Sequence, residues 1–174
     1  FYGCLFARKK YCSNIPWPGG DKTQLKRFTA KKENLINKIR QMECPIGSYE
    51  IKNQSIPQEA LALYLHINPR NLWKATIKSI GQLAKVIECD GRNSNPHQEV
   101  LSEIQKSVGK KKYVIFDLDT KDYTMLKECI DIVDGHCEII ETRGGYHILV
   151  PTSKTQLIKN KKWYNLIAEK TDVA

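Results

Sequence analysis

The sequence predicts an α+β fold rather than a doubly wound parallel sheet. Two observations lead to this prediction. The first part of the chain is predicted to run helix, strand, helix, helix, and from Lys110 on the order becomes strand, helix, strand, tight turn, strand, helix. Strands joined by a tight turn pair in antiparallel fashion, so this order favours helices packed on an antiparallel sheet. The 174 residues, 41% of them hydrophobic, can bury a core in one large domain or two small ones.

The first part of the chain is predicted to contain one strand and three helices. Prolines and glycines make residues 13–25 a loop, and apolar residues near a 3.6-residue period predict a helix over Lys26–Met42. Ala60–Ile67 is an apolar run typical of a strand. A helix is predicted over Arg70–Glu88, and a further short helix over residues 97–108.

The segment between residues 70 and 108 has two further features. Residues 90–96, with the sequence DGRNSNP, are expected to be a turn-forming linker between the two helices. The first of these helices carries one apolar stripe, formed by Trp73, Ile77, Ile80, Ala84 and Ile87.

The second part of the chain is predicted to form a small unit of strands and helices. Tyr113–Asp119 is a buried strand, and Asp122–Val133 is a helix with an apolar face. Cys137–Thr142 and Tyr146–Val150 are two strands joined by a glycine-containing turn, which is typical of a hairpin. Trp163–Lys170 is predicted to be the last helix.

The basic residues are concentrated near the start of the chain. The whole chain carries 28 Lys+Arg against 19 Asp+Glu, a net charge of +9. Residues 1–40 alone hold ten basic and two acidic residues, a net of +8. A polyanion such as nucleic acid would explain this asymmetry, since neutralised phosphates release counterions. We therefore expect a basic mixed α/β unit over residues 1–109 and a second unit over 110–174, packed together as one compact domain.

Composition argues against several other classes of protein. Ordinary hydrophobic and charged fractions argue against a mainly disordered chain, and no apolar stretch approaches the ~20 residues that span a bilayer. The chain begins with Phe1 and shows no secretory signal, so we expect a piece of a longer intracellular protein. The six cysteines contain no CxxC spacing, so free thiols are expected, and a zinc site involving Cys4 and Cys12 is not.

The first chemistry-bearing motif is Phe116-Asp117-Leu118-Asp119, at the end of an apolar strand. Side chains alternate along a strand, so Asp117 and Asp119 project from the same face. Two carboxylates this close repel each other unless a cation lies between them, and oxygen ligands suit Mg²⁺ or Mn²⁺. A different interpretation is that these aspartates sit in a turn and cap the next helix. Phosphatases and mutases with an aspartyl nucleophile are disfavoured, because their motif has Thr or Val where this chain has Lys121.

The second motif is Arg143-Gly144-Gly145-Tyr146-His147, between the two hairpin strands. Glycines let backbone amides approach a phosphate closely, and Arg143 adds a planar set of donors. His147 lies just inside the next strand, where it can point at the same anion. A plain hairpin turn with a partly buried histidine remains the other interpretation. No phosphate-binding loop ending in Gly-Lys-Ser/Thr and no GxGxxG motif occurs.

The two motifs together resemble the catalytic module of archaeo-eukaryotic primases and of the primase-polymerase superfamily. The resemblance implies that Asp117 and Asp119 bind divalent metal, and that Gly144, Gly145 and His147 bind the triphosphate of an incoming nucleotide. It also implies an RRM-like catalytic module preceded by a mixed α/β unit. Upstream, the chain is similar to basic motifs of viral and plasmid-borne members, which suggests nucleic-acid contacts at Arg8, Lys9, Lys10 and Arg70.

The chain departs from the family pattern at a third motif, a hydrophobic residue followed by a metal-binding aspartate. The only late aspartate is Asp172, and the residue before it is Thr171. Either Asp172 is an altered form of this motif, or the third carboxylate lies beyond Ala174, which is what we expect.

The sequence therefore predicts a template-directed nucleotidyltransferase, a DNA primase, a polymerase or both, working with Mg²⁺ or Mn²⁺. Its expected partners are a single-stranded DNA template and nucleoside triphosphates, without a membrane, and with further domains or a helicase in the full-length protein. The expected location is inside the cell where replication occurs, with a virus or mobile element as a possible source. Two alternatives stay open: a non-catalytic RRM-like nucleic-acid-binding module, and a metal-dependent nuclease or topoisomerase-type domain in which Glu59 would join the aspartates.

Overall fold

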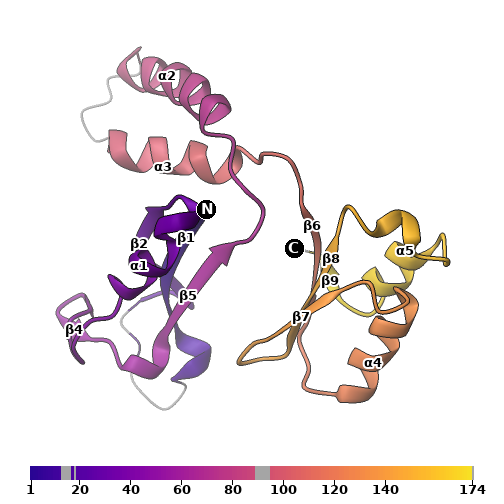
Figure 1. Ribbon diagram of the computed structural model, residues 1–174. Helices are drawn as coiled ribbons and strands as arrows, with labels where there is room; N and C mark the ends of the chain where they lie inside the picture. Colours follow the sequence, from indigo (N-terminus) through magenta and orange to yellow (C-terminus); the bar gives the residue numbers. More distant parts are fainter. Residues whose placement is uncertain (13–16, 18, 89–94, 174) are drawn as a thin grey trace. The chain divides into compact units, whose positions relative to one another are not determined.

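The computed structural model describes residues 1–12, 17, 19–88 and 95–173, and the chain divides into two compact units (Figure 1). Unit 1 is Phe1–Lys110 and unit 2 is Lys111–Ala174. The strands that the structure describes form small antiparallel sheets, accompanied by five α-helices. The predicted α+β class is therefore confirmed.

Unit 1 is built on a three-stranded sheet with the order β2-β1-β5. The central strand β1 (Tyr2–Arg8) pairs in antiparallel fashion with β2 (Lys22–Thr29) and with β5 (Leu61–His66). One face of this sheet is covered by an apolar cluster around Ala7 and Ile56, close to the small hairpin of β3 (Glu50–Ile51) and β4 (Gln54–Ser55).

The strand β2 overturns the helix predicted over Lys26–Met42. The structure has a strand as far as Thr29, a 3-10 turn at Lys32–Asn34, and only a short helix, α1 (Leu35–Arg40). Phe28 explains the strand, because it pairs with Gly3 on β1 and its ring lies where a β-carbon of Gly3 would be. Pairing with a neighbouring strand thus outweighs the local helical period. The predicted loop is also shorter than 13–25, since β2 begins at Lys22; residues 13–16 and 18 lie outside the described residues.

The other two helices predicted in unit 1 are confirmed as α2 (Leu72–Glu88) and α3 (Pro96–Lys106), which pack side by side (Figure 1). Asn95 caps α3 by accepting a hydrogen bond from Gln98 N, and most of the linker predicted at 90–96 lies outside the described residues. The predicted strand of this region is confirmed as β5, which follows a 3-10 turn at Gln58–Ala60.

Unit 2 follows the predicted order with small changes in the bounds. Its elements are β6 (Tyr113–Leu118), α4 (Tyr123–Ile132), β7 (Glu138–Glu141), β8 (Tyr146–Pro151), α5 (Trp163–Ala168) and β9 (Asp172–Val173). The two-residue strand β9 was not expected from the sequence. It pairs with β6 and extends the sheet to four strands, in the order β7-β8-β6-β9.

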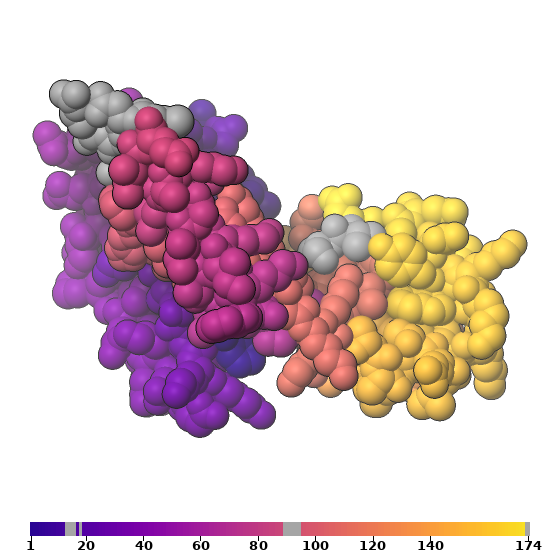
Figure 2. All heavy atoms as spheres, turned by 90° about the horizontal axis from the view of Figure 1, so that it is seen from above, coloured from indigo at the N-terminus to yellow at the C-terminus, as the bar shows by residue number. Residues whose placement is uncertain are grey.

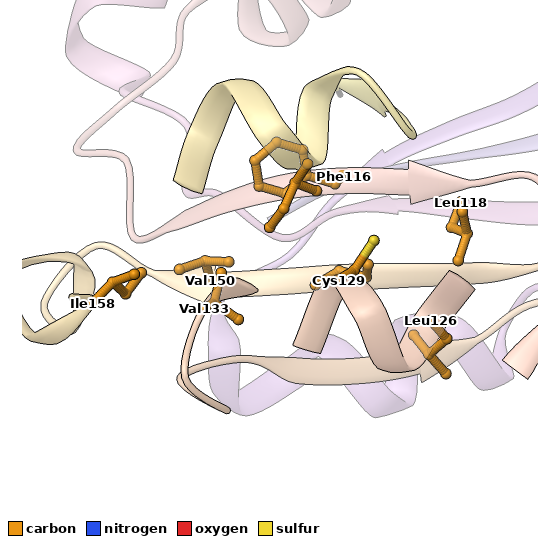
Figure 3. Close-up of a cluster of buried hydrophobic side chains, with 9 residues drawn as sticks. Phe116, Leu118, Leu126, Cys129, Val133, Val150 and Ile158 are labelled. Carbon is orange, nitrogen blue, oxygen red and sulfur yellow. The ribbon is translucent and has the colours of Figure 1, made fainter. Parts of the chain in front are cut away.

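The two faces of this sheet differ in character. Phe116, Leu118 and Val150 point to one face of the sheet (Figure 3). There they pack with Leu126 of α4 and with Val133, the residue that follows this helix. Ile167 of α5 joins the same cluster. Since side chains alternate along a strand, the residues between these core positions project to the opposite face. We call this opposite side of the unit 2 sheet the open face.

Candidate functional site

A row of polar side chains crosses three neighbouring strands on the open face. Asp117 on β6 is paired directly with His147 on β8 and with Asp172 on β9. Directly paired residues of antiparallel strands project to the same face, with β-carbons about 4.5–5.5 Å apart. The sheet therefore brings His147, Asp117 and Asp172 into one row, although they are distant in the sequence.

Asp117 and His147 form the best-defined contact of this row. Nε2 of His147 lies 3.3 Å from Oδ1 of Asp117, and the two side chains are 34% and 35% exposed. Both groups are thus held on rigid strands and still reach solvent. The sequence had placed them in two separate motifs, and the strand register joins these motifs into one site.

The turn between β7 and β8 lies against the end of β6. A β-carbon at Gly145 would overlap the carbonyl oxygen of Leu118 and would lie 2.8 Å from Thr120 N. A glycine is needed at position 145 because of this close approach. Its φ angle is not positive, so backbone conformation is not the reason. A β-carbon at Gly144 would be 3.8 Å from Oδ1 of Asp119, which is an ordinary contact. The glycine turn and Asp119 are therefore neighbours.

The turn is held by hydrogen bonds that the sequence did not suggest. Gly145 N donates to Thr142 Oγ1 at 3.1 Å, and Thr142 N donates to Gly145 O at 2.9 Å. The amide of Gly145 is therefore engaged within the turn. A phosphate at this turn would instead meet the exposed residues Arg143 and Gly144.

Lys121 fastens the turn to the loop that follows β6. Its Nζ donates to Glu141 Oε1 and, at 2.6 Å, to the carbonyl oxygen of Thr142, and it lies 5.3 Å from the centre of the Tyr146 ring. In the sequence, Lys121 was notable only as an argument against one class of phosphatase. Nothing in the sequence separates it from other exposed lysines, because its role depends on the hairpin that it reaches.

The other interpretation of Asp117 and Asp119 was that they cap the next helix. In the structure Asp122 caps this helix instead. Oδ1 of Asp122 accepts a hydrogen bond from Thr124 N at 2.8 Å and caps α4. Asp119 is exposed between the end of β6 and this cap.

The carboxylates fit a hard divalent cation by their chemistry. Mg²⁺ is commonly held by one or two carboxylates, with water and substrate phosphates completing its ligands. As the side chains stand, the described residues include no group of three or more His, Cys, Asp or Glu that could hold a metal ion. Asp117 and Asp119 stay the predicted pair of carboxylates, and Asp172 is the further carboxylate residue whose backbone pairs with that of Asp117. Cys4 and Cys12 do not form a pair for zinc, because Cys12 packs with Ala7, on the sheet face opposite to Cys4.

The candidate nucleic-acid residues all lie in unit 1. Arg8 ends β1, and Lys9 and Lys10 are exposed on the 3-10 turn that follows (Lys9–Tyr11). Arg70 precedes α2, where its backbone forms a bridge to Val108.

Arg8 belongs to a sheet face that combines cations with aromatic rings. It donates a hydrogen bond to the hydroxyl of Tyr64, and Nζ of Lys22 lies 4.3 Å from the centre of the Phe6 ring and 4.8 Å from that of Tyr64. At the other end of this face, α3 contacts the sheet through a hydrogen bond from Arg27 Nη1 to Ser102 Oγ. We call the group formed by Phe6, Arg8, Lys22, Tyr64, His66 and Arg70 the basic-aromatic face.

Electrostatics mark this face as a place for an anion. Burial lowers the pKa of His66 below its ordinary value, and the positive charges of Arg70 and Lys22 lower it further. Burial also lowers the pKa of Arg70. Among the described residues, Nε of both Arg8 and Arg70 is buried without a hydrogen-bond partner. The positive charges gathered on this face would attract an anionic ligand.

The comparisons with known proteins do not name a family. No protein-family model matches the chain, no curated protein matches it, and no solved structure matches it. Within the described residues, no helix is both long enough and apolar enough to cross a membrane.

Proposed function

We propose that the chain is a template-directed nucleotidyltransferase of the primase-polymerase type, acting as a DNA primase, a polymerase or both. The observation that carries this proposal is the row of His147, Asp117 and Asp172 on the open face of unit 2, with Asp119 and the glycine turn at its end. Carboxylates and phosphate-binding groups on one accessible surface are what transfer of a nucleotide requires.

The arrangement of unit 2 supports the RRM-like part of the proposal. Its elements follow the order β-α-β-β-α-β, and the first and third strands, β6 and β8, are the two central strands of the sheet. Both helices contribute to the core on one side, and on the other side the side chains of His147 and Asp117 still reach solvent. Central strands on an open face are the natural place for a site that must admit a primer, a template and a nucleotide.

In this proposal each residue has a distinct role. Asp117 and Asp119 would hold Mg²⁺ or Mn²⁺ together with the phosphates of the nucleotide. The bound ion would supply charge neutralisation and a lower pKa for the attacking 3′-hydroxyl. His147, whose Nε2 lies 3.3 Å from Oδ1 of Asp117, would exchange this contact for a hydrogen bond to a phosphate oxygen. Arg143 and the amide of Gly144 would stabilise negative charge on the phosphates.

Asp172 is the best candidate for the third carboxylate within this chain. The sequence favoured a residue beyond Ala174 because Thr171 replaces the expected hydrophobe. The direct pairing of Asp172 with Asp117 supports Asp172 itself, since their side chains project to the same face.

The template would bind to the basic-aromatic face of unit 1. Bases of single-stranded DNA can stack on exposed rings, and the phosphate backbone can pair with arginine and lysine. Phe6 and Tyr64 supply partly exposed rings, and Arg8 and Lys22 supply the cations beside them.

The proposal is tested by extension of a primed DNA template, and by synthesis without a primer, in Mg²⁺ and in Mn²⁺. Asp117→Asn and Asp119→Asn should each abolish incorporation, and Asp172→Asn should reduce it strongly. Asp131→Asn is the matched control, because Asp131 is an exposed aspartate on α4, on the other side of the sheet. Circular dichroism should show an unchanged fold for all four variants. Incorporation at the wild-type rate by Asp117→Asn would contradict the proposal.

Binding measurements separate the nucleotide role from the template role. His147→Ala should weaken triphosphate binding by roughly 1–3 kcal/mol if a hydrogen bond to a charged group is lost. It should leave the binding of single-stranded DNA unchanged, since His147 is in unit 2 and the basic-aromatic face is in unit 1. Calorimetry with and without Mg²⁺ gives both affinities. Equal triphosphate affinity in chelator would show that the carboxylates do not act through a metal.

The two alternative functions find less support. A binding module of the RRM type needs paired aromatic side chains on its central strands. On β6 and β8 of this chain, a central pair on the open face is Asp117 and His147. The nuclease alternative needs Glu59 on a strand of a parallel sheet, and Glu59 lies instead on a 3-10 turn of unit 1.

A further inference from the structure

The apolar stripe of α2 is exposed, although its pattern is that of a buried helix face. Trp73 is 76% exposed, Ile80 is 65% exposed and Ile87 is 77% exposed. Ile77 is exposed as well, at 56%. Contiguous exposed apolar side chains of this size usually mark an interaction site. In Figure 2, which looks down on this part of unit 1, the magenta spheres of α2 lie in front, at the surface.

The packing of unit 1 does not use this stripe. The residues of α2 that are buried are Ala75 and Ser79, on the side of the helix where α3 packs. At 100° per residue, these two positions lie on the other side of the helix from Trp73 and Ile77. The helix therefore has two different sides. Unit 1 covers the side with the small residues Ala75 and Ser79, and the side with the large apolar residues stays exposed.

The spacing of the stripe is that of a helix-pairing seam. Its members are Trp73, Ile77, Ile80, Ala84 and Ile87, so the steps along the sequence are four, three, four and three residues. This alternation is the a and d pattern by which two helices pack knobs into holes. The spacing fits a partner helix as the occupant, and the charge beside the stripe indicates its kind.

The charge beside the stripe indicates what kind of helix would fit. Lys74, Lys78 and Lys85 are exposed along one edge of the stripe, and the only acidic residue of α2 is Glu88, at its last position. The opposite edge, with Thr76, is uncharged. In an antiparallel pair of two copies, the lysine edges would fall on the same side and repel each other. In a parallel pair, each lysine edge would meet an uncharged edge. Neither pairing neutralises the lysines.

We propose that the α2 stripe is a docking site for an amphipathic helix of a partner protein, with apolar residues at heptad spacing and acidic residues along one edge. The apolar residues would cover Trp73, Ile77, Ile80 and Ile87, and the acidic edge would lie against Lys74, Lys78 and Lys85. This proposal is independent of the nucleotidyltransferase reaction, because no residue of the open face of unit 2 takes part in it.

The test uses the whole chain and a fluorescently labelled synthetic peptide of about 21 residues, long enough to form a helix, with Leu at a and d and Glu at e and g. A second peptide has Lys in place of every Glu. Fluorescence anisotropy should show that the Glu peptide binds about tenfold or more tightly than the Lys peptide. Ile77→Ser with Ile80→Ser should remove this binding. The matched control is Ile36→Ser with Ile46→Ser, which changes two exposed isoleucines elsewhere in unit 1 and should bind like the wild type.

A charge-swap variant makes the test independent of any loss of folding. Lys74→Glu, Lys78→Glu and Lys85→Glu together should reverse the preference, so that the Lys peptide binds more tightly. Equal binding of both peptides, or binding that survives the double serine variant, would overturn the proposal. A dimer of the chain that the serine variant dissociates in sedimentation would show a second copy as the occupant instead. Stripe-dependent binding to phosphatidylserine vesicles would show a membrane.

Discussion

Gly144 and Gly145 are adjacent in the sequence but have different physical roles. Gly145 lies against the backbone at the end of β6, where a β-carbon would overlap Leu118 O. Gly144 has room for a methyl group, which would point toward Asp119. Gly145 is therefore expected to matter for the packing of the turn, and Gly144 for the space beside Asp119.

We predict that Gly145→Ala lowers the free energy of unfolding by at least about 2 kcal/mol, because the turn must move away from β6. Gly144→Ala should change it by less than about 0.5 kcal/mol, as is usual for an exposed position. Urea denaturation measures both changes. Under the proposed function, Gly144→Ala should still weaken triphosphate binding, since its methyl group enters the space beside Asp119. Equal stability losses for the two variants would mean that the turn does not lie against β6 as described.

His66 gives a prediction about pH. Burial, together with Arg70 and Lys22, lowers its pKa in the folded chain below the ordinary value of 6.5. The unfolded chain therefore binds more protons than the folded chain below about that pH, so stability is fully present above 6.5 and falls as the pH drops through it.

His66→Gln should flatten this loss of stability between pH 7.5 and pH 5, as measured by urea denaturation at a series of pH values. His97→Gln, an exposed change on α3, should keep the wild-type pH dependence. A wild-type profile in His66→Gln would show that His66 does not cause the loss of stability at low pH.

The elements that were predicted correctly are those whose own residues give a clear signal. The strand that carries Asp117 and the hairpin around the glycine turn each have a clear apolar run and a clear boundary. The direct pairing of Asp117 with His147 needed only one further fact, the antiparallel register of β6 and β8. The position of Asp172 could not be predicted, because a two-residue strand such as β9 has too little sequence to be recognised.

The first part of the chain was harder to predict because non-local contacts decide its structure. The strand β1 was missed, and the beginning of the predicted Lys26–Met42 helix is in fact strand β2. β2 becomes a strand because it pairs with β1, and Phe28 fits over Gly3. The helix α2 was predicted correctly, but periodicity alone could not show that its stripe would be left uncovered.

Asp122 offers a prediction about a single element. Its side chain accepts a hydrogen bond from Thr124 N and caps α4, so Asp122→Ala should lower the free energy of unfolding by about 1 kcal/mol. Asn95→Ala, which removes the corresponding cap of α3, should have a similar effect. Asp122→Ala should leave nucleotide incorporation unchanged under the proposed function. A loss of incorporation with unchanged stability would place Asp122 in the site rather than in the cap.

For the molecule as a whole, the charge is divided sharply between the two units. Unit 1 holds 18 basic and 9 acidic residues, and unit 2 holds 10 of each, so unit 1 carries the entire net charge of +9. The candidate carboxylates are in the neutral unit and the basic-aromatic face is in the positive one. This division agrees with the proposed separation of tasks, with unit 1 binding a polyanion and unit 2 carrying out the chemistry.

The salt dependence of DNA binding tests whether the charge of unit 1 acts at a defined place or as a diffuse field. We predict that Lys10→Glu with Lys22→Glu weakens single-stranded DNA binding. Both lysines lie over aromatic rings, on or directly beside the basic-aromatic face. The slope of log K against log salt should become shallower by about 1.4, since each lost phosphate contact on a single strand contributes about 0.7.

Lys31→Glu with Lys32→Glu is the matched control, because it makes the same change of charge at two exposed positions of unit 1 outside that face. This pair should lower the affinity slightly through the long-range field and leave the slope close to the wild-type value. Fluorescence anisotropy with a labelled oligonucleotide at several salt concentrations measures both slopes. If the two pairs flatten the slope equally, the DNA responds only to the net charge of unit 1, and the basic-aromatic face is not its binding site.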